Sequence, residues 1–129
     1  MADDGTLTWR ELWLEASELL GDANEARWIC MEAGGLDRIE WASSLEEAVG
    51  ERAVARVDAM VARRREGEPL QYVIGNWAFR NVELMVDRRV LIPRPETELL
   101  AEFAIEAARR FAPTRLVVDL GTGSGAIAL

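Results

Sequence analysis

Hydrophobic residues recur at helical spacing along the first part of the chain. The first such stretch starts after Thr8, which forms with Glu11 the capping-box pattern that begins many helices, and it ends at Gly21. The second stretch covers residues 22–33 and ends at Gly34-Gly35, a typical helix end. The pattern therefore predicts two amphipathic helices.

A third amphipathic stretch follows a short helical turn that we expect over Leu36–Trp41. Ser44 with Glu47 repeats the capping-box pattern, and apolar residues then recur at helical spacing to about Glu66. Single amphipathic helices of this length are marginal in water, so their apolar faces should pack against one another. The pattern predicts an N-terminal all-α helical bundle over residues 1–66.

An alternating pattern replaces the helical one after Gly67-Glu68-Pro69. Trp77-Ala78-Phe79 and residues 82–86 alternate as β-strands do, and two residues separate them. The second of these, Asn81, tolerates the left-handed backbone that a tight hairpin turn requires. We expect a β-hairpin within a linker that covers residues 67–95.

A rigid segment and another helix come next. Each proline in Leu91-Ile92-Pro93-Arg94-Pro95 fixes its own φ and keeps the preceding residue out of the helical region. Pro95 suits the first position of a helix, and Glu96 and Glu98 favour the positive end of that helix. An apolar stripe then runs toward Phe111, which predicts one more amphipathic helix.

The last stretch has the order of a buried strand, a glycine-rich turn and a helix start. Leu116–Leu120 is apolar apart from Asp119, Gly121-Thr122-Gly123-Ser124-Gly125 follows directly, and Ala126–Leu129 has helical character. This order opens a doubly wound α/β sheet, in which ligands bind beyond the carboxyl ends of the strands. We expect a Rossmann-like α/β domain to begin over residues 96–129.

The glycine-rich turn is the candidate site for a nucleotide-like cofactor. Glycines let a ligand approach the backbone closely, and the unpaired amides of the following helix face an anion such as a phosphate or a carboxylate. The residues of this turn are Gly121, Thr122, Gly123, Ser124 and Gly125. Their Gly-x-Gly-x-Gly spacing differs from the Gly-x-Gly-x-x-Gly dinucleotide fingerprint, which favours S-adenosylmethionine and leaves a nicotinamide cofactor open. Asp119 is placed to accept hydrogen bonds from the turn amides or from the cofactor's ammonium group.

Composition excludes several kinds of chemistry. Cys30 is the only cysteine and there is no histidine, so we predict no internal disulfide and no metal site. All 15 basic residues are arginine, which excludes a lysine-dependent P-loop. The net charge of -8 argues against nucleic-acid binding, and we interpret the one basic cluster, Arg63-Arg64-Arg65, as a solvated helix end. No apolar run is long enough for a membrane span, so we expect a cytoplasmic protein.

Three motifs together resemble those of the release-factor glutamine methyltransferase family. In chain order they are Gly67-Glu68-Pro69-Leu70-Gln71-Tyr72, Val90-Leu91-Ile92-Pro93-Arg94-Pro95-Glu96-Thr97-Glu98, and the stretch from Val118 to Leu129. The resemblance implies a helical domain that helps to hold the release factor, a hairpin linker, and a class I methyltransferase domain that uses S-adenosyl-L-methionine. The acceptor would be the glutamine of the Gly-Gly-Gln motif of peptide chain release factors. A sister family that methylates a ribosomal protein shares much of this layout.

The resemblance also implies that the chain is the front part of a longer enzyme. The family completes its pocket with an Asn-Pro-Pro-Tyr motif and with an acidic residue for the cofactor ribose, and this sequence has neither. We therefore expect no catalytic residue in this chain and no methyl transfer by it. The residues expected near the pocket mouth are Arg94, Pro95, Glu96 and Thr97. For these four, contact with the substrate and simple rigidity both remain open.

Three functions stay open at this point. The first is a protein glutamine methyltransferase, acting on a release factor or on a ribosomal protein. The second is a helical release-factor-binding module without activity, and the third is a nicotinamide-dependent enzyme with the same opening strand and turn.

Overall fold

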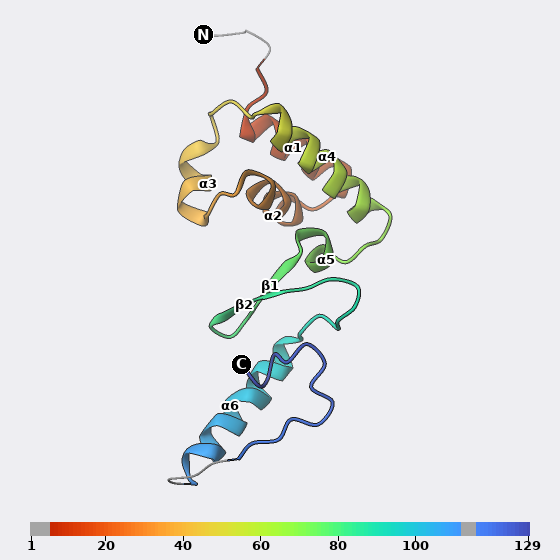
Figure 1. The fold of residues 1–129 in the computed structure, drawn as a ribbon. Coiled ribbons are helices and arrows are strands. Elements are labelled where there is room, and N and C mark those ends of the chain that lie inside the picture. Colours follow the sequence, from red (N-terminus) through yellow and green to blue (C-terminus); the bar gives the residue numbers. More distant parts are fainter. Residues whose placement is uncertain (1–5, 112–115) are drawn as a thin grey trace. The chain divides into compact units, whose positions relative to one another are not determined.

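The computed structural model of this chain describes residues 6–111 and 116–129 (Figure 1). The described residues form two compact units, and the boundary between the units falls between Ile74 and Gly75. Unit 1 contains the helices α1 (Trp9–Leu20), α2 (Ala23–Gly34), α3 (Arg38–Ser44), α4 (Glu51–Arg65) and α5 (Leu70–Ile74). Unit 2 contains the strands β1 (Asn76–Phe79) and β2 (Val82–Met85) and the helix α6 (Pro95–Arg109). The predicted order of a helical region, a hairpin and a further helix is confirmed.

Helix α1 begins at the capping box that the sequence predicts. The Thr8 hydroxyl accepts a hydrogen bond from the Glu11 amide, and the Glu11 carboxylate accepts one from the Thr8 amide at 2.9 Å. The second of these bonds lowers the pKa of the Glu11 carboxyl below its ordinary value. Both bonds satisfy amides that have no partner inside the helix, so they fix where α1 starts.

Helix α2 ends at two glycines that have different roles. Gly35 lies in the left-handed region, with a φ of 64°, which glycine adopts without strain. Gly34 leaves space for the ring of Trp9, because a Cβ at position 34 would lie only 2.7 Å from that ring. The helix end predicted at Gly34-Gly35 is confirmed, and both positions require a residue without a side chain.

The third long helix starts later than the sequence predicts. The short turn expected over Leu36–Trp41 is α3, which reaches Ser44, and α4 begins only at Glu51, so the capping box predicted at Ser44 is wrong. The segment between α3 and α4 pairs with the start of α1. The carbonyls of Leu45 and Glu47 accept hydrogen bonds from the first two amides of α1, at 2.9 and 3.1 Å. The carbonyls of this segment therefore accept hydrogen bonds from the N-terminal amides of α1, and the segment does not form the start of α4.

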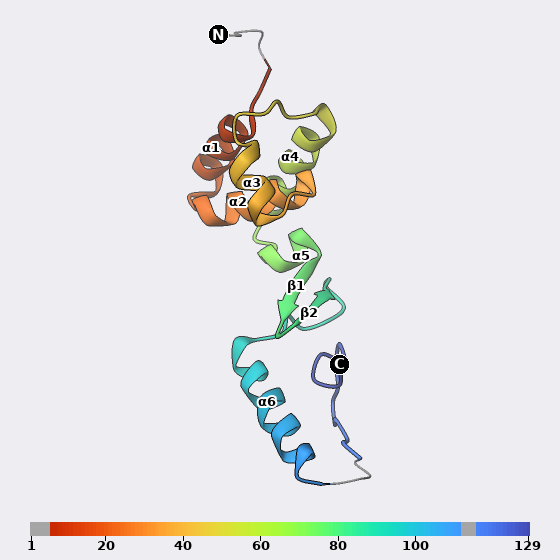
Figure 2. The same ribbon diagram turned by 90° about the vertical axis from the view of Figure 1, so that its left-hand side faces the viewer.

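Helices α1, α2 and α4 pack around one hydrophobic core, and they lie side by side in both views (Figures 1 and 2). The least exposed side chains of this core are Ala26, Ile29, Cys30 and Val57. On α3, Trp41 meets the rings of Trp9 and Trp13 edge to face, with both pairs of ring centroids 6.1 Å apart. Such pairs add about 0.5–1.5 kcal/mol each to the burial of the rings, so they attach α3 to α1.

The arginines at the end of α4 are at least partly exposed at a helix end, as the sequence predicts, but two of them also form ion pairs that the sequence does not predict. Arg63 donates to both carboxylate oxygens of Glu68, at 2.7 and 2.9 Å, and to the carbonyls of Tyr72 and Val73 in α5. Glu68 is only 8% exposed. Its hydrogen bond raises the pKa of the Arg63 guanidinium. Since the last carbonyls of a helix lack partners within it, Arg63 supplies donors that α5 cannot supply itself.

A second ion pair fixes the same loop to α2. Arg64 donates to both carboxylate oxygens of Glu25, at 2.7 and 3.0 Å, and to the backbone carbonyl of Glu68 at 3.3 Å. The two arginines together hold the loop between α4 and α5 from both sides. The sequence interpretation missed this because it considered the arginines only as neighbours along one helix.

Helix α5 has no counterpart in the sequence prediction. Gly67-Glu68-Pro69 ends α4 as expected, and the chain then forms a short helix instead of an extended linker. Val73 and Ile74 of this helix are buried in the core of unit 1. That core therefore extends past residue 66, and the predicted domain boundary at residue 66 remains a prediction.

Unit 2 begins with the hairpin that the sequence predicts. Strands β1 and β2 are antiparallel, with Phe79 opposite Val82, so Arg80 and Asn81 form a two-residue turn. The left-handed residue of the turn is Arg80, with a φ of 54°, and not Asn81, although asparagine tolerates this conformation better. Helix α6 follows, with Pro95 at its first position as predicted.

The strand and helix predicted after α6 are not formed. Residues 116–119 have no regular secondary structure, and the side chains of Leu116 and Leu120 are each 89% exposed. An inner strand of a parallel sheet needs neighbours on both sides, and the paired strands of the described chain are β1 and β2 alone. Ala126–Leu129 forms turns instead of a helix. The prediction of a strand over Leu116–Leu120 is therefore wrong for this structure, and the start of a Rossmann-like sheet is not seen.

We predict that Glu68→Ala destabilises unit 1 by about 2 kcal/mol, because it removes a charged hydrogen-bond partner of Arg63. The loss should stay below the roughly 3–5 kcal/mol of a fully buried pair, since the Arg63 side chain is 44% exposed. Urea unfolding followed by tryptophan fluorescence measures the effect. Glu66→Ala, an exposed change in the same loop, is the control and should alter stability by less than about 0.5 kcal/mol. Equal midpoints for the two variants would contradict the assigned role of Glu68.

Candidate functional site

The glycine-rich turn has a backbone that only glycine adopts easily. The φ angles of Gly121, Gly123 and Gly125 are 74°, 54° and 81°. The Gly125 amide donates to the Thr122 carbonyl at 2.8 Å, and the Gly125 carbonyl accepts from the Leu129 amide at 3.2 Å. A Cβ at Gly121 or Gly125 would meet nothing within 4 Å, so backbone conformation and not crowding requires glycine here. The side chains of Thr122 and its neighbour Ser124 are exposed.

Asp119 has a buried carboxylate oxygen without a donor. No described residue donates a hydrogen bond to its Oδ2 atom. The residue lies on a mostly apolar cavity of about 280 Å³, lined by Ala101, Ala104, Ile105, Ala108, Val117, Asp119, Ile127, Ala128 and Leu129. An unsatisfied buried acceptor costs about 1–3 kcal/mol, and an amine donor would remove that cost. The ammonium group of S-adenosylmethionine is a donor of this kind.

The fit of these residues to a whole S-adenosylmethionine molecule is incomplete. Pockets for ligands of this size usually have volumes of about 300–1,000 Å³, and the cavity at Asp119, at about 280 Å³, is at the lower end of this range. No residue of Gly121–Gly125 lines it. Asp119 and the glycine-rich turn are neighbours in the sequence. The structure does not bring them into one pocket.

The four residues expected at the pocket mouth form the start of α6. Arg94 precedes the helix in an extended conformation, and its carbonyl accepts a hydrogen bond from the Thr97 amide at 3.0 Å. Pro95 lines a polar hollow of about 490 Å³ together with Arg80, Asn81, Glu98, Leu99 and Glu102. Arg94, Glu96 and Thr97 do not line this hollow, and it shares no residue with the cavity at Asp119.

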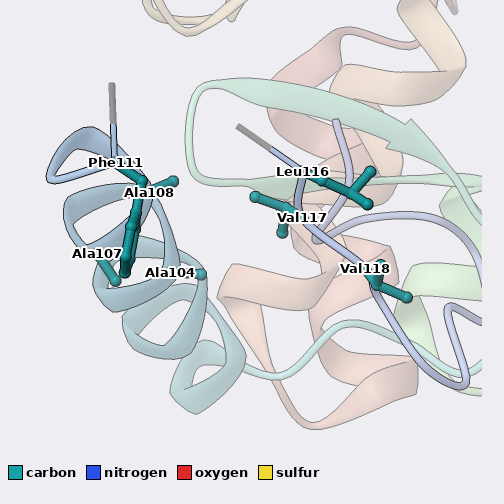
Figure 3. Close-up of a pocket in the computed structure, with 7 residues that line it drawn as sticks. All are labelled: Ala104, Ala107, Ala108, Phe111, Leu116, Val117 and Val118. Atoms are coloured by element: carbon teal, nitrogen blue, oxygen red, sulfur yellow. The ribbon is translucent and has the colours of Figure 1, made fainter. Parts of the chain in front are cut away.

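An apolar groove of about 490 Å³ lies between α6 and residues 116–118 (Figure 3). Its lining residues are Ala104, Ala107, Ala108, Phe111, Leu116, Val117 and Val118. Figure 3 shows the helix residues on one side of the groove and Leu116, Val117 and Val118 on the other. The segment thus lies beside α6, but its apolar side chains remain mostly exposed, so the helix does not bury them as we expect for an unpaired apolar segment in water.

The sequence interpretation missed one pair of polar residues in unit 2. The Glu98 carboxylate accepts a hydrogen bond from the Arg80 backbone amide at 3.1 Å, and the Arg80 guanidinium donates to the Glu98 carbonyl at 3.5 Å. From the sequence, Glu98 is expected only to favour the positive end of the helix. No local signal marks Arg80, because the contact joins a hairpin turn to a helix 18 residues later.

Other kinds of site are absent from the described residues. Burial raises the pKa of the Cys30 thiol to about 12, so this cysteine is not a nucleophile near neutral pH. Residues 6–111 and 116–129 contain no group of histidine, cysteine and acidic side chains that could hold a metal ion. In the same parts of the chain, no helix has the length and apolar character needed to cross a membrane.

Comparison with known proteins identifies the helical part of the chain. Residues 6–75 match the family described as PrmC N-terminal domain. The chain is 44% identical over 116 residues to the release factor glutamine methyltransferase of Burkholderia pseudomallei, which covers 90% of this chain and 40% of that protein. It is 39% identical over 126 residues to the protein of the same name from Bacillus subtilis, which covers 95% of this chain and 43% of that protein. For the Lactococcus lactis protein of that name, the identity is 35% over 122 residues, with 92% of this chain and 44% of that protein covered.

The matches cover most of this chain but less than half of each relative. The chain spans about two fifths of the length of these relatives. The family match covers more than half of the chain and ends one residue beyond unit 1. The chain belongs to the PrmC N-terminal domain family, and its relatives are release factor glutamine methyltransferases.

Proposed function

We propose that this chain is the N-terminal part of a protein glutamine methyltransferase that uses S-adenosyl-L-methionine. The reaction transfers a methyl group to the side-chain amide nitrogen of the glutamine in the Gly-Gly-Gln motif of peptide chain release factors, in the cytoplasm. The observation that carries this proposal is the PrmC N-terminal domain match over residues 6–75. The names of the relatives favour release factors over the ribosomal-protein and nicotinamide alternatives.

Unit 1 is the part that we propose to hold the release factor. A recognition domain must keep its surface in place without help from the partner, and unit 1 has the core for this. Its helices share one cluster of buried side chains, and ion pairs close its last loop. Rigid surfaces bind with a smaller loss of conformational entropy than mobile ones do.

Unit 2 is proposed to supply the first part of the cofactor site. The residues assigned to the cofactor are Gly121, Thr122, Gly123, Ser124, Gly125 and Asp119. The left-handed glycines support this assignment, because they leave the backbone open to a ligand, and so does the orphaned Asp119 oxygen. Arg94, Pro95, Glu96 and Thr97 are proposed to lie near the mouth of the pocket, and the support is that Pro95 borders a hollow.

The chemistry of the reaction explains why we assign no catalytic residue to this chain. S-adenosylmethionine supplies an electrophilic methyl group on a sulfonium. The acceptor amide nitrogen is a poor nucleophile because its lone pair is delocalised into the carbonyl. An enzyme must therefore orient that amide and stabilise the charge redistribution through fixed hydrogen bonds. The resemblance to the family assigns this task to an Asn-Pro-Pro-Tyr motif, which this sequence lacks, so we expect no methyl transfer by the chain itself.

A second candidate function is a release-factor-binding module without activity. Two observations favour it. The core of unit 1 is closed, whereas in unit 2 the apolar side chains of Leu116 and Leu120 remain exposed. Binding would need only unit 1, and methyl transfer would need a complete cofactor site.

We predict that the chain binds a bacterial release factor but does not methylate it. The measurements are sedimentation velocity for the complex and incorporation of radiolabelled methyl groups for the activity. The full-length Bacillus subtilis relative is the control for both. Methyl incorporation by the chain would contradict the absence of catalytic residues. Failure of the chain to bind a release factor that the full-length relative binds would contradict the role of unit 1.

We predict that the chain binds S-adenosylmethionine more weakly than the micromolar range, because Asp119 and the glycine turn do not share a pocket. A calorimetric isotherm in the micromolar range, worth about 8 kcal/mol, would contradict this. In a chimera of this chain with the C-terminal part of the Bacillus subtilis relative, Gly123→Val should abolish cofactor binding. Valine is strained at a φ of 54°, and its side chain blocks approach to the backbone. Gly50→Ala is the matched control, since the φ of Gly50 is -71°, and it should leave cofactor affinity unchanged.

A further inference from the structure

The hairpin turn contains a residue in an unfavourable conformation. Arg80 has a φ of 54°, and within the described parts of the chain it is the one non-glycine residue with a positive φ. The left-handed region is unfavourable for any residue other than glycine, because the Cβ atom comes too close to the backbone. Such a conformation persists where the surrounding structure holds the residue in place. The question is therefore which contact holds Arg80.

Glu98 in the first turn of α6 provides that contact from two directions. Its carboxylate Oε1 accepts the hydrogen bond of the Arg80 backbone amide at 3.1 Å. Its own backbone carbonyl accepts a bond from the Arg80 guanidinium at 3.5 Å. The hydrogen bond from the Arg80 amide to the Glu98 carboxylate is charge-assisted, which makes it stronger than a hydrogen bond between neutral groups. The two residues are thus joined by backbone and side chain of both partners.

The other end of the hairpin is held by backbone pairing. The Val86 amide donates to the Gly75 carbonyl at 3.0 Å, which continues the β1–β2 pairing past the strand ends. The strands pair up to the turn, where Phe79 lies opposite Val82, and the two turn residues Arg80 and Asn81 lie outside this pairing. Glu98 therefore contacts a residue that the β1–β2 pairing does not include.

The hollow at the start of α6 gives a second indication that turn and helix belong together. Arg80 and Asn81 come from the turn and Pro95, Glu98 and Glu102 from the helix, and all of them line it. Glu102 lies one helical turn after Glu98. It borders the same hollow but makes no hydrogen bond with Arg80 in the described structure, so it is a natural control.

We propose that Glu98 is a positioning residue that fixes the hairpin turn on the start of α6. In this view the hairpin and α6 form one rigid element, and the hairpin is not part of a flexible linker. The segment between them, which ends at Arg94, is then held at both ends. This inference does not depend on the proposed methyltransferase function.

The test is amide hydrogen exchange of the chain by NMR, with three variants. Glu98→Ala should speed exchange of the Arg80 amide at least about tenfold, because the amide loses its acceptor. Glu98→Gln should restore most of the protection, since the Gln oxygen still accepts. Glu102→Ala should leave the rate unchanged. In the unmodified chain, a scalar coupling across the hydrogen bond should join the Arg80 nitrogen to the Glu98 carboxyl carbon.

A second variant separates positioning from general destabilisation. Arg80→Gly keeps the amide donor and removes the strain, so the hairpin should depend less on Glu98 in this background. Glu98→Ala should then change the exchange of the hairpin amides several-fold less than it does beside Arg80. The proposal is overturned if the Arg80 amide exchanges at the same rate with and without the Glu98 carboxylate. It is also overturned if Glu98→Ala deprotects the amides of α6 as much as that of Arg80, because Glu98 would then serve the helix and not the turn.

Discussion

The ion pair between Arg63 and Glu68 is the constraint that fixes how the helical unit ends. One guanidinium serves both carboxylate oxygens of Glu68 and two carbonyls of α5, and the carboxylate is almost fully buried. A buried carboxylate without its partner would be strongly unfavourable, so the loop between α4 and α5 has little freedom to rearrange. This constraint places Val73 and Ile74 in the core and sets the point at which the chain leaves unit 1.

The two units differ in how completely their apolar side chains are buried. In unit 1 the helices bury their apolar faces on one another, and the tryptophan cluster attaches α3. In unit 2 the helix α6 exposes Leu99, Leu100 and Phe103, and the segment that follows it lies along one side of that helix only. Large exposed apolar surfaces usually mark places where further protein binds. The difference agrees with a family match that covers unit 1 and ends at its boundary.

Sequence alone predicted the features that depend on neighbouring residues. The capping box at Thr8, the helix end at Gly34-Gly35 and the first position of α6 at Pro95 each involve groups within a few residues, and each is confirmed. The failures involve partners that the helical pattern itself does not bring together. Ser44 does not cap a helix because the carbonyls after it accept hydrogen bonds from α1, and Arg63, although partly exposed, is held in an ion pair because Glu68 folds back onto it. In the candidate site, the need for glycine in the turn was readable, whereas the orphaned oxygen and the contact between Arg80 and Glu98 depend on tertiary structure.

The most direct test of this account compares two shortened chains, one ending at Gly75 and one at Glu66. If α5 and its ion pair complete the helical unit, residues 1–75 should unfold cooperatively with the stability that unit 1 has in the whole chain. Residues 1–66 lack Glu68, Val73 and Ile74, and burial of the two apolar side chains alone contributes about 3 kcal/mol or more. Denaturant unfolding should therefore show at least that loss for the shorter chain. Equal stability of the two chains would contradict the claim that α5 belongs to the folded unit.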